Sequence, residues 1–327
     1  MITNFSLDED FFTSAGLNNE NLSAIHDFIT RSWIDHGVLI LPKNGRRDLL
    51  NLIEKLPLKY KQRWLTAAEY GKSSELNTSW WNFSSFENFA DSCSLSKQFK
   101  TAFSNDETCF VLSGGVDCKA HCSQTGFEML GAGLCSESIN FQNSLNLSRS
   151  DIFGHTSAEH VWVDRFEPLA KFSKKITIID RYFFQNTWES AQRKDKESSM
   201  KNFFTFLSKM GKKYHVKIIS YGDIKNSEFH TGIYDFFYKS IIKSPALYQA
   251  LESWELISAQ ESFFQGESHD RLMGFDRHIC QVGNGMRIFG LPPFPRSTFT
   301  ARYDHNSEIP QRETALRKKL LWRECSD

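Results

Sequence analysis

In the C-terminal half of the chain, short and mostly apolar stretches alternate with stretches in which apolar residues recur at helical spacing. The stretches at 176–179 and 216–220, in which only Thr177, Lys217 and Ser220 are polar, predict buried strands, because strands covered on both faces need no polar alternation. The apolar positions at 200–210 and 233–242 recur every three or four residues and predict helices, as do those at 159–172. Strand, helix, strand and helix in this order predict an α/β layer with parallel strands.

The N-terminal half shows the same two patterns less regularly. Residues 19–33 and 48–56 carry apolar positions at helical spacing, and 38–41 is an apolar run that predicts a buried strand. Residues 72–108 are rich in Ser, Asn and Phe and predict loops, and 110–112 predicts a second short strand. We therefore expect an α/β fold here too, without a sequence signal for its role.

The chain ends on a basic stretch, Gln311 to Arg323, which predicts a helix with an apolar side at Leu316, Leu320 and Leu321. With 327 residues the chain is long enough for two domains. The predicted boundaries are an N-terminal α/β domain at 1–155, a second α/β domain at 156–305, and a basic helical tail at 306–327.

Composition restricts where this protein works and what it binds. The 39 basic residues balance the 39 acidic ones, so affinity for nucleic acid or a membrane must come from a local patch. The seven cysteines are an odd number in a long chain, which is typical of a reducing compartment. The acidic N-terminus does not resemble a signal peptide, and no apolar run is long enough for a transmembrane segment. We expect a cytoplasmic protein.

One spaced pattern carries the candidate chemistry. It consists of His269-Asp270-Arg271, four residues, Asp276, six residues, and Gly283-Asn284-Gly285. The alternation across 269–282 predicts two short strands with His269 and Arg271 on one face. An imidazole can attack a phosphodiester while a neighbouring cation binds the charge that develops on its oxygens.

This pattern resembles the phospholipase D superfamily signature His-x-Lys-x4-Asp-x6-Gly-Ser, with Arg271 in the lysine position and Asn284 in the serine position. It is most similar to the phospholipase D-like domain at the C-terminus of MIT-domain proteins and to bacterial stand-alone relatives. In those proteins a strand ending in Asp-Pro-Tyr comes first, here Asp180-Arg181-Tyr182. The resemblance covers roughly 160–300.

The resemblance implies a role for each matching residue. His269, Arg271 and Asp276 take the catalytic positions, and Arg271, Gly283, Asn284 and Gly285 the phosphate-binding ones, with no cofactor and no metal. Asp180, Arg181, Tyr182 and Asp223 are supporting residues. Because the chain carries a single motif, catalysis implies a homodimer with two facing histidines. Arginine in place of lysine keeps the charge but changes the geometry of phosphate contact.

Several alternatives stay open from the sequence alone. Arg271 can instead pair with Asp180 inside the fold, and Asp180 with Asp223 can cap helices or hold a metal for a different nuclease chemistry. One cluster of residues offers either a zinc site or scattered buried thiols, and its irregular spacing favours thiols. The residues concerned are Cys109, Cys118, His121, Cys122 and Cys135.

A locally basic region at 170–215 predicts either a solvated helical face or a groove for a phosphate backbone. Its members are Lys171, Lys174, Lys175, Arg193, Lys194, Lys196, Lys212 and Lys213.

The resemblance leads us to expect a metal-independent phosphodiesterase, a nuclease-type effector of a bacterial conflict or phage-defence system. Its substrate would be nucleic acid or another phosphodiester. The alternative is a non-catalytic module that binds phosphates of nucleic acid, lipid headgroups or a partner protein from the same system.

Overall fold

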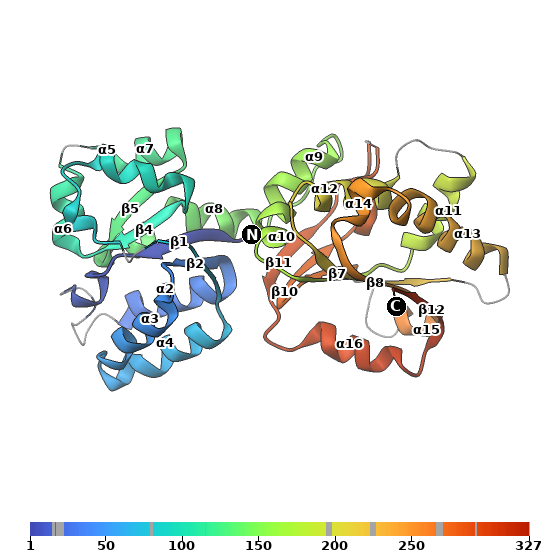
Figure 1. The fold of residues 1–327 in the computed structure, drawn as a ribbon, viewed down its shortest axis with the longest axis horizontal. Coiled ribbons are helices and arrows are strands. Elements are labelled where there is room, and N and C mark those ends of the chain that lie inside the picture. Colours follow the sequence, from blue (N-terminus) through green and yellow to red (C-terminus); the bar gives the residue numbers. More distant parts are fainter. Residues whose placement is uncertain are drawn as a thin grey trace. The chain divides into compact units, whose positions relative to one another are not determined.

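The computed structural model describes residues 1–14, 17, 23–78, 81–114, 116–193, 198–222, 227–265, 271–291 and 293–326. Their contacts divide the chain into two compact units, one of Ile2–Asn146 and one of Leu147–Asp327 together with Met1. The sequence predicts the boundary at 155, whereas the contacts place it after Asn146. Both units contain a sheet with helices on its two faces, so the fold is α/β (Figure 1).

The N-terminal unit is built on a five-stranded parallel sheet in the order β3-β2-β1-β4-β5. Its strands are β1 (Thr3–Leu7), β2 (Gly37–Leu41), β3 (Lys72–Glu75), β4 (Thr101–Ser104) and β5 (Glu128–Gly131). One face carries α2 (Ser23–His36), α3 (Gly45–Glu54) and α4 (Leu58–Tyr70), and the other α5 (Phe89–Ser92), α6 (Asp106–Leu112) and α7 (Cys118–Thr125) (Figure 1). Helix α8 (Ile139–Leu147) follows β5.

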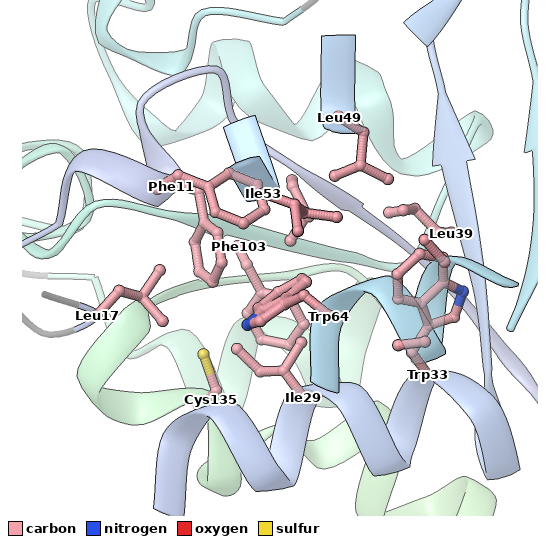
Figure 2. Packing of buried hydrophobic residues seen from close by; sticks show 14 of the residues in the cluster. Phe11, Leu17, Ile29, Trp33, Leu39, Leu49, Ile53, Trp64, Phe103 and Cys135 are labelled. Atoms are coloured by element: carbon pink, nitrogen blue, oxygen red, sulfur yellow. The ribbon is translucent and has the colours of Figure 1, made fainter. Parts of the chain in front are cut away.

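Aromatic side chains fill the core on the α2–α4 side of this sheet. Figure 2 shows Trp64, Phe11 and Phe103 close together, with Ile29 and Trp33 projecting from α2. All residues of β2 are buried, which confirms the buried strand predicted at 38–41. A strand buried on both faces gains from each apolar side chain about 25 cal/mol per Å² of area removed from water.

The C-terminal unit contains a seven-stranded mixed sheet in the order β11-β10-β9-β6-β7-β8-β12. Its strands are β6 (Lys175–Ile179), β7 (Tyr214–Tyr221), β8 (Leu251–Ala259), β9 (Leu272–Phe275), β10 (His278–Val282), β11 (Phe299–Tyr303) and β12 (Leu320–Cys325). Only β6, β7 and β8 pair in parallel, and the other pairs are antiparallel. β6 is the middle strand, between parallel β7 and antiparallel β9.

Helices cover both faces of this second sheet (Figure 1). One face carries α9 (Ala158–Val161), α10 (Glu167–Lys171), α11 (Phe183–Gln192), α12 (Ser199–Ser208), α13 (Ser227–Phe237) and α14 (Pro245–Tyr248). The other carries α15 (Glu261–Gln265) and α16 (Glu308–Leu316). A π-helical turn, Trp162–Phe166, joins α9 to α10, so the helix predicted over 159–172 is confirmed. The strands predicted at 176–179 and 216–220 are confirmed as parts of β6 and β7.

Three predicted elements are wrong. Residues 110–112 belong to α6, because the Asn105 side chain caps that helix by accepting a hydrogen bond from the Thr108 amide at 2.7 Å. Phe110 is 81% exposed on it. Residues 72–108, predicted as loops, contain β3 and β4. The helix predicted at 311–323 ends at Leu316, and β12 then pairs with β8, so 306–327 contains an edge strand of the sheet. Within the described ranges, no helix is both long and apolar enough to cross a bilayer.

Candidate functional site

Asp180 lies at the carboxyl end of β6, the middle strand of the second sheet. Asp180 is 2% exposed. Its two carboxylate oxygens accept hydrogen bonds from backbone amides. The Met286 amide donates to Oδ2 at 2.7 Å and the Tyr182 amide to Oδ1 at 3.0 Å. Burial raises the pKa of this carboxyl group, while the two amides and the Arg271 guanidinium act in the opposite direction. Asp180 is therefore a buried acceptor that fixes the backbone around it.

Arg271 directly precedes β9 and lies beside Asp180, because Leu272 pairs with Ile179 in the antiparallel register. Its Nε lies 3.7 Å from Oδ1 of Asp180, and its Nη1 donates a hydrogen bond to the Gly283 carbonyl. The centre of the guanidinium lies 5.2 Å from the ring centre of Tyr182. The side chain is 26% exposed. These contacts hold the guanidinium in place while part of it faces solvent, which suits an anion-binding group.

The backbone at 283–286 closes over this pair. Gly285 has a φ of +54°, and a Cβ built on it would lie 2.0 Å from Oδ2 of Asp180 and 2.6 Å from Cδ of Arg271. Only glycine allows both the left-handed backbone and this close approach. Asn284 points elsewhere: its side-chain amide donates to the Pro295 carbonyl, and its backbone amide to the Ser297 hydroxyl at 3.0 Å.

Gly285→Ala should lower the free energy of unfolding of the second unit by at least about 2 kcal/mol, since it adds a steric overlap to the cost of a left-handed alanine. Hydrogen exchange of the β6 and β9 amides measures this. Gly211→Ala is the matched control, because Gly211 has a φ of +66° with nothing within 4 Å of its would-be Cβ. An equal loss for both variants would contradict close packing at Gly285.

Asp276, a predicted catalytic residue, lies at the other end of β9. It occupies the turn between β9 and β10 with a φ of +51°, and its Oδ1 accepts hydrogen bonds from the Lys174 and Lys175 amides at 3.1 and 2.9 Å. Those residues begin β6, whereas Asp180 follows its end. At a rise of about 3.4 Å per residue, the five residues from Arg271 to Asp276 span roughly 17 Å. The structure does not bring Asp276 to the Arg271 site, and its contacts are those of a turn residue.

Two predicted site residues, His269 and Asp223, lie outside the described residues. Arg181 forms an ion pair with Glu261, and its guanidinium also lies 5.2 Å from the ring centre of Tyr182. Arg271 forms an ion pair with Asp180, as the alternative of pairing inside the fold predicts, and the functional roles of both residues stay predictions. The sequence did not reveal the Met286 amide or the Gly285 contact, although a Gly-x-Gly turn after a strand is a signal of close backbone approach.

Most of the predicted basic region does not gather beside Arg271. Lys174 and Lys175 lie at the start of β6, and Lys213 precedes β7, at the opposite sheet edge. Lys175 and Lys213 form ion pairs with Glu313 and Glu252. Lys212 donates to two backbone carbonyls, those of Ala170 and Lys171. Lys194 and Lys196 lie outside the described residues. The described lysines Lys174, Lys175, Lys212 and Lys213 therefore do not form the predicted groove, and Arg193 is considered below.

The cysteines are free thiols. Among the residues that the structure describes, no three His, Cys, Asp or Glu side chains lie close enough to hold a metal ion. Cys93 and His121 form a pair, with Sγ 3.3 Å from Nε2. Burial raises the pKa of Cys109 and Cys280 to about 12, as is usual for thiols in a protein interior.

Comparison with known proteins gives no family for this chain. No protein-family model matches it, and no curated protein matches it by sequence. Among solved structures, TrmBL2, an archaeal chromatin protein with a novel mode of DNA binding, is similar at 9% identity and a TM-score of 0.23. The match covers 52% of this chain and 51% of TrmBL2. A likeness of this extent carries no argument about fold or function.

Proposed function

We propose that the C-terminal unit is a phospholipase D-like phosphodiesterase that acts on nucleic acid. The observation that carries the proposal is the Arg271 guanidinium, fixed against Asp180, Gly283 and Tyr182 at the carboxyl end of the middle strand. Ligands of α/β sheets bind outside the carboxyl ends of strands. A preoriented cation at that place can bind a phosphate without reorganising when charge develops on it.

In this proposal His269 supplies the nucleophile. Its imidazole nitrogen attacks phosphorus, a bond between phosphorus and nitrogen forms, and the bond to one ester oxygen breaks. The second histidine, from another copy of the chain, protonates that oxygen as it leaves. Water then attacks the phosphohistidine and releases the phosphate monoester, while the second histidine takes the proton of that water. Arg271 binds the non-bridging oxygens throughout, and Asp180 positions Arg271.

The cellular setting is part of the same proposal. The resemblance to bacterial stand-alone relatives supports an effector of a conflict or phage-defence system, and seven free thiols suit a reducing cytoplasm. Such an effector would act as a homodimer or together with a partner protein of its system.

A second candidate function is a non-catalytic phosphate-binding module, and one observation favours it. Arg271 stands where the resemblance implies lysine, and its Nε and Nη1 already face Asp180 and Gly283. A guanidinium so engaged can still bind an anion through its remaining nitrogen, but with one edge only. Its ligand would be the same phosphate group on nucleic acid, a lipid headgroup or a partner protein.

The purified full chain should cleave a labelled oligonucleotide in excess EDTA, because the proposed mechanism uses histidine and no metal. Light scattering under the same conditions should give the mass of a dimer, since one motif supplies one histidine. His269→Ala is the negative control for a contaminating nuclease. Cleavage that requires a divalent metal, or cleavage by a monomer, would contradict this mechanism. Phosphate binding without cleavage under any condition would favour the module.

A further inference from the structure

A polar cavity of about 300 Å³ lies between α11, α12 and the 3-10 helix η7 (Gly285–Phe289). Two guanidinium groups from separate elements line it, Arg193 after α11 and Arg287 in η7. The carboxylate in its wall, Glu189, accepts a hydrogen bond from Gln185 at 3.1 Å. Among the described residues of the lining, two arginines outnumber one carboxylate, and this balance favours an anion.

Hydroxyl and amide groups complete the lining. One side of α11 contributes Asn186 and Ser190, and Arg193 directly follows that helix. The three residues share a face because their positions are three, four and seven apart. Ser198 and Ser199 contribute the start of α12, a helix of ten residues. The Ser198 hydroxyl caps that helix by accepting from the Lys201 amide at 3.2 Å. The helix start adds partial positive charge to that of the guanidiniums.

This cavity, which we call the η7 cavity, is joined to the Arg271 site by η7 itself. The Met286 amide donates to Asp180, and the next residue, Arg287, lines the cavity. The Asn202 side chain on α12 holds the far end of η7 by donating to the Phe289 carbonyl at 2.9 Å. The same short helix therefore presents one residue to each site.

We propose that the η7 cavity binds a second phosphate of the strand whose scissile phosphodiester lies at Arg271, so that the substrate class is a polynucleotide. This inference rests on the proposed function of the Arg271 site. A glycerophospholipid of the common kind carries one phosphodiester, whereas a polynucleotide carries one at every step, and only the polymer can occupy both sites. Arginine binds phosphate through paired N–H groups, and two arginines can hold one phosphate from two directions.

The test is the salt dependence of binding by full-length Arg287→Ala. The probe is a fluorescent oligothymidylate of about 12 nucleotides, followed by anisotropy in EDTA with His269→Ala as the common background, so that no variant cleaves it. The logarithm of the binding constant falls linearly with the logarithm of the salt concentration, and loss of one phosphate contact should make this slope shallower by about 0.7. Affinity at low salt should fall about tenfold. A dinucleoside monophosphate, which has one phosphodiester, should bind Arg287→Ala and its parent equally.

Two variants make the outcome decisive. Lys209→Ala removes an exposed cation at the far end of α12 and should leave the slope within error, since Lys209 lies outside the cavity and pairs with Glu159. Arg271→Ala should weaken the binding of both the oligothymidylate and the dinucleoside monophosphate. An unchanged slope in Arg287→Ala, with weakening in Arg271→Ala, would overturn the second subsite and leave the proposed function standing. If neither Arg287→Ala nor Arg271→Ala changes binding, both the second subsite and the proposed function are overturned.

Two further results would also overturn the inference. Equal slope changes in Arg287→Ala and Lys209→Ala would mean that charge acts diffusely and that no subsite exists. Vesicles containing phosphatidylglycerol provide the lipid arm. If Arg287→Ala weakens vesicle binding as strongly as it weakens oligonucleotide binding, the cavity does not select a polymer. Arg287 is exposed, and circular dichroism should show that its variant is folded.

Discussion

Asp180→Ala is expected to lower the free energy of unfolding of the C-terminal unit by about 3–5 kcal/mol, because it removes one partner of a largely buried ion pair. The carboxylate accepts from the Met286 and Tyr182 amides and faces Arg271. Its loss leaves the buried Met286 amide and the partly buried Tyr182 amide without their acceptor, and the Arg271 guanidinium without its carboxylate partner. Hydrogen exchange of the β6 and β9 amides should show this loss, while the amides of the N-terminal sheet should exchange as before.

A second substitution separates charge from contact. Asp180→Asn keeps the shape of the side chain but presents an NH₂ group where one backbone amide needs an acceptor. We therefore expect it to lower the free energy of unfolding, but by less than Asp180→Ala does. Asp235→Ala is the control: its exposed ion pair joins α13 to Lys239 in the π-helical turn that follows, and it contributes about 0.3–0.5 kcal/mol. If Asp180→Ala unfolds no more easily than Asp235→Ala, then Asp180 does not organise this sheet edge.

The largest effect on turnover is expected from His269→Ala. A nucleophile adds little to ground-state binding, so this variant should bind oligonucleotide nearly as tightly as the parent but lose at least about three orders of magnitude in kcat. Arg271→Ala should instead weaken binding by about 1.5–3 kcal/mol, the contribution of a charge-assisted hydrogen bond. Single-turnover cleavage and anisotropy measure the two quantities separately.

The comparison needs a variant that keeps the charge at position 271. Arg271→Lys restores the residue that the phospholipase D signature carries, and it should retain more binding than Arg271→Ala because the charge remains. Both must be checked for folding, since Arg271 is the partner of buried Asp180. If His269→Ala cleaves at the parent rate, the histidine mechanism is wrong.

Short, mostly apolar stretches made the middle of the second sheet predictable. Residues 176–179 and 216–220 have no amphipathic helical alternative, and their pairing brings Asp180 to a strand end as expected. The strand β8 was missed because Glu252, Ser253 and Glu255 interrupt its apolar positions. β12 was missed because its leucines also fit a helical spacing that continues α16. In both cases pairing with a neighbouring strand outweighs local pattern.

Spacing alone could not place the parts of the candidate site. The signature puts Asp276 five residues after Arg271, but an extended strand carries it to the opposite sheet edge, where it binds the Lys174 and Lys175 amides. The contact of the Met286 amide with Asp180 joins residues 106 positions apart and leaves no local signal. Glycines at 283 and 285 were expected to bind phosphate, whereas Gly285 packs against Asp180 and Arg271.

The central claim is that His269 attacks a phosphodiester held by Arg271. The most direct test is to mix the full chain with an oligonucleotide carrying one radiolabelled internal phosphodiester, and to stop the reaction in alkaline denaturant, because a phosphohistidine is labile in acid. If His269 is the nucleophile, the label should appear on the peptide that contains His269, no more slowly than product forms, and it should be absent in His269→Ala. Product formed with no labelled protein, or label on another residue, would contradict it.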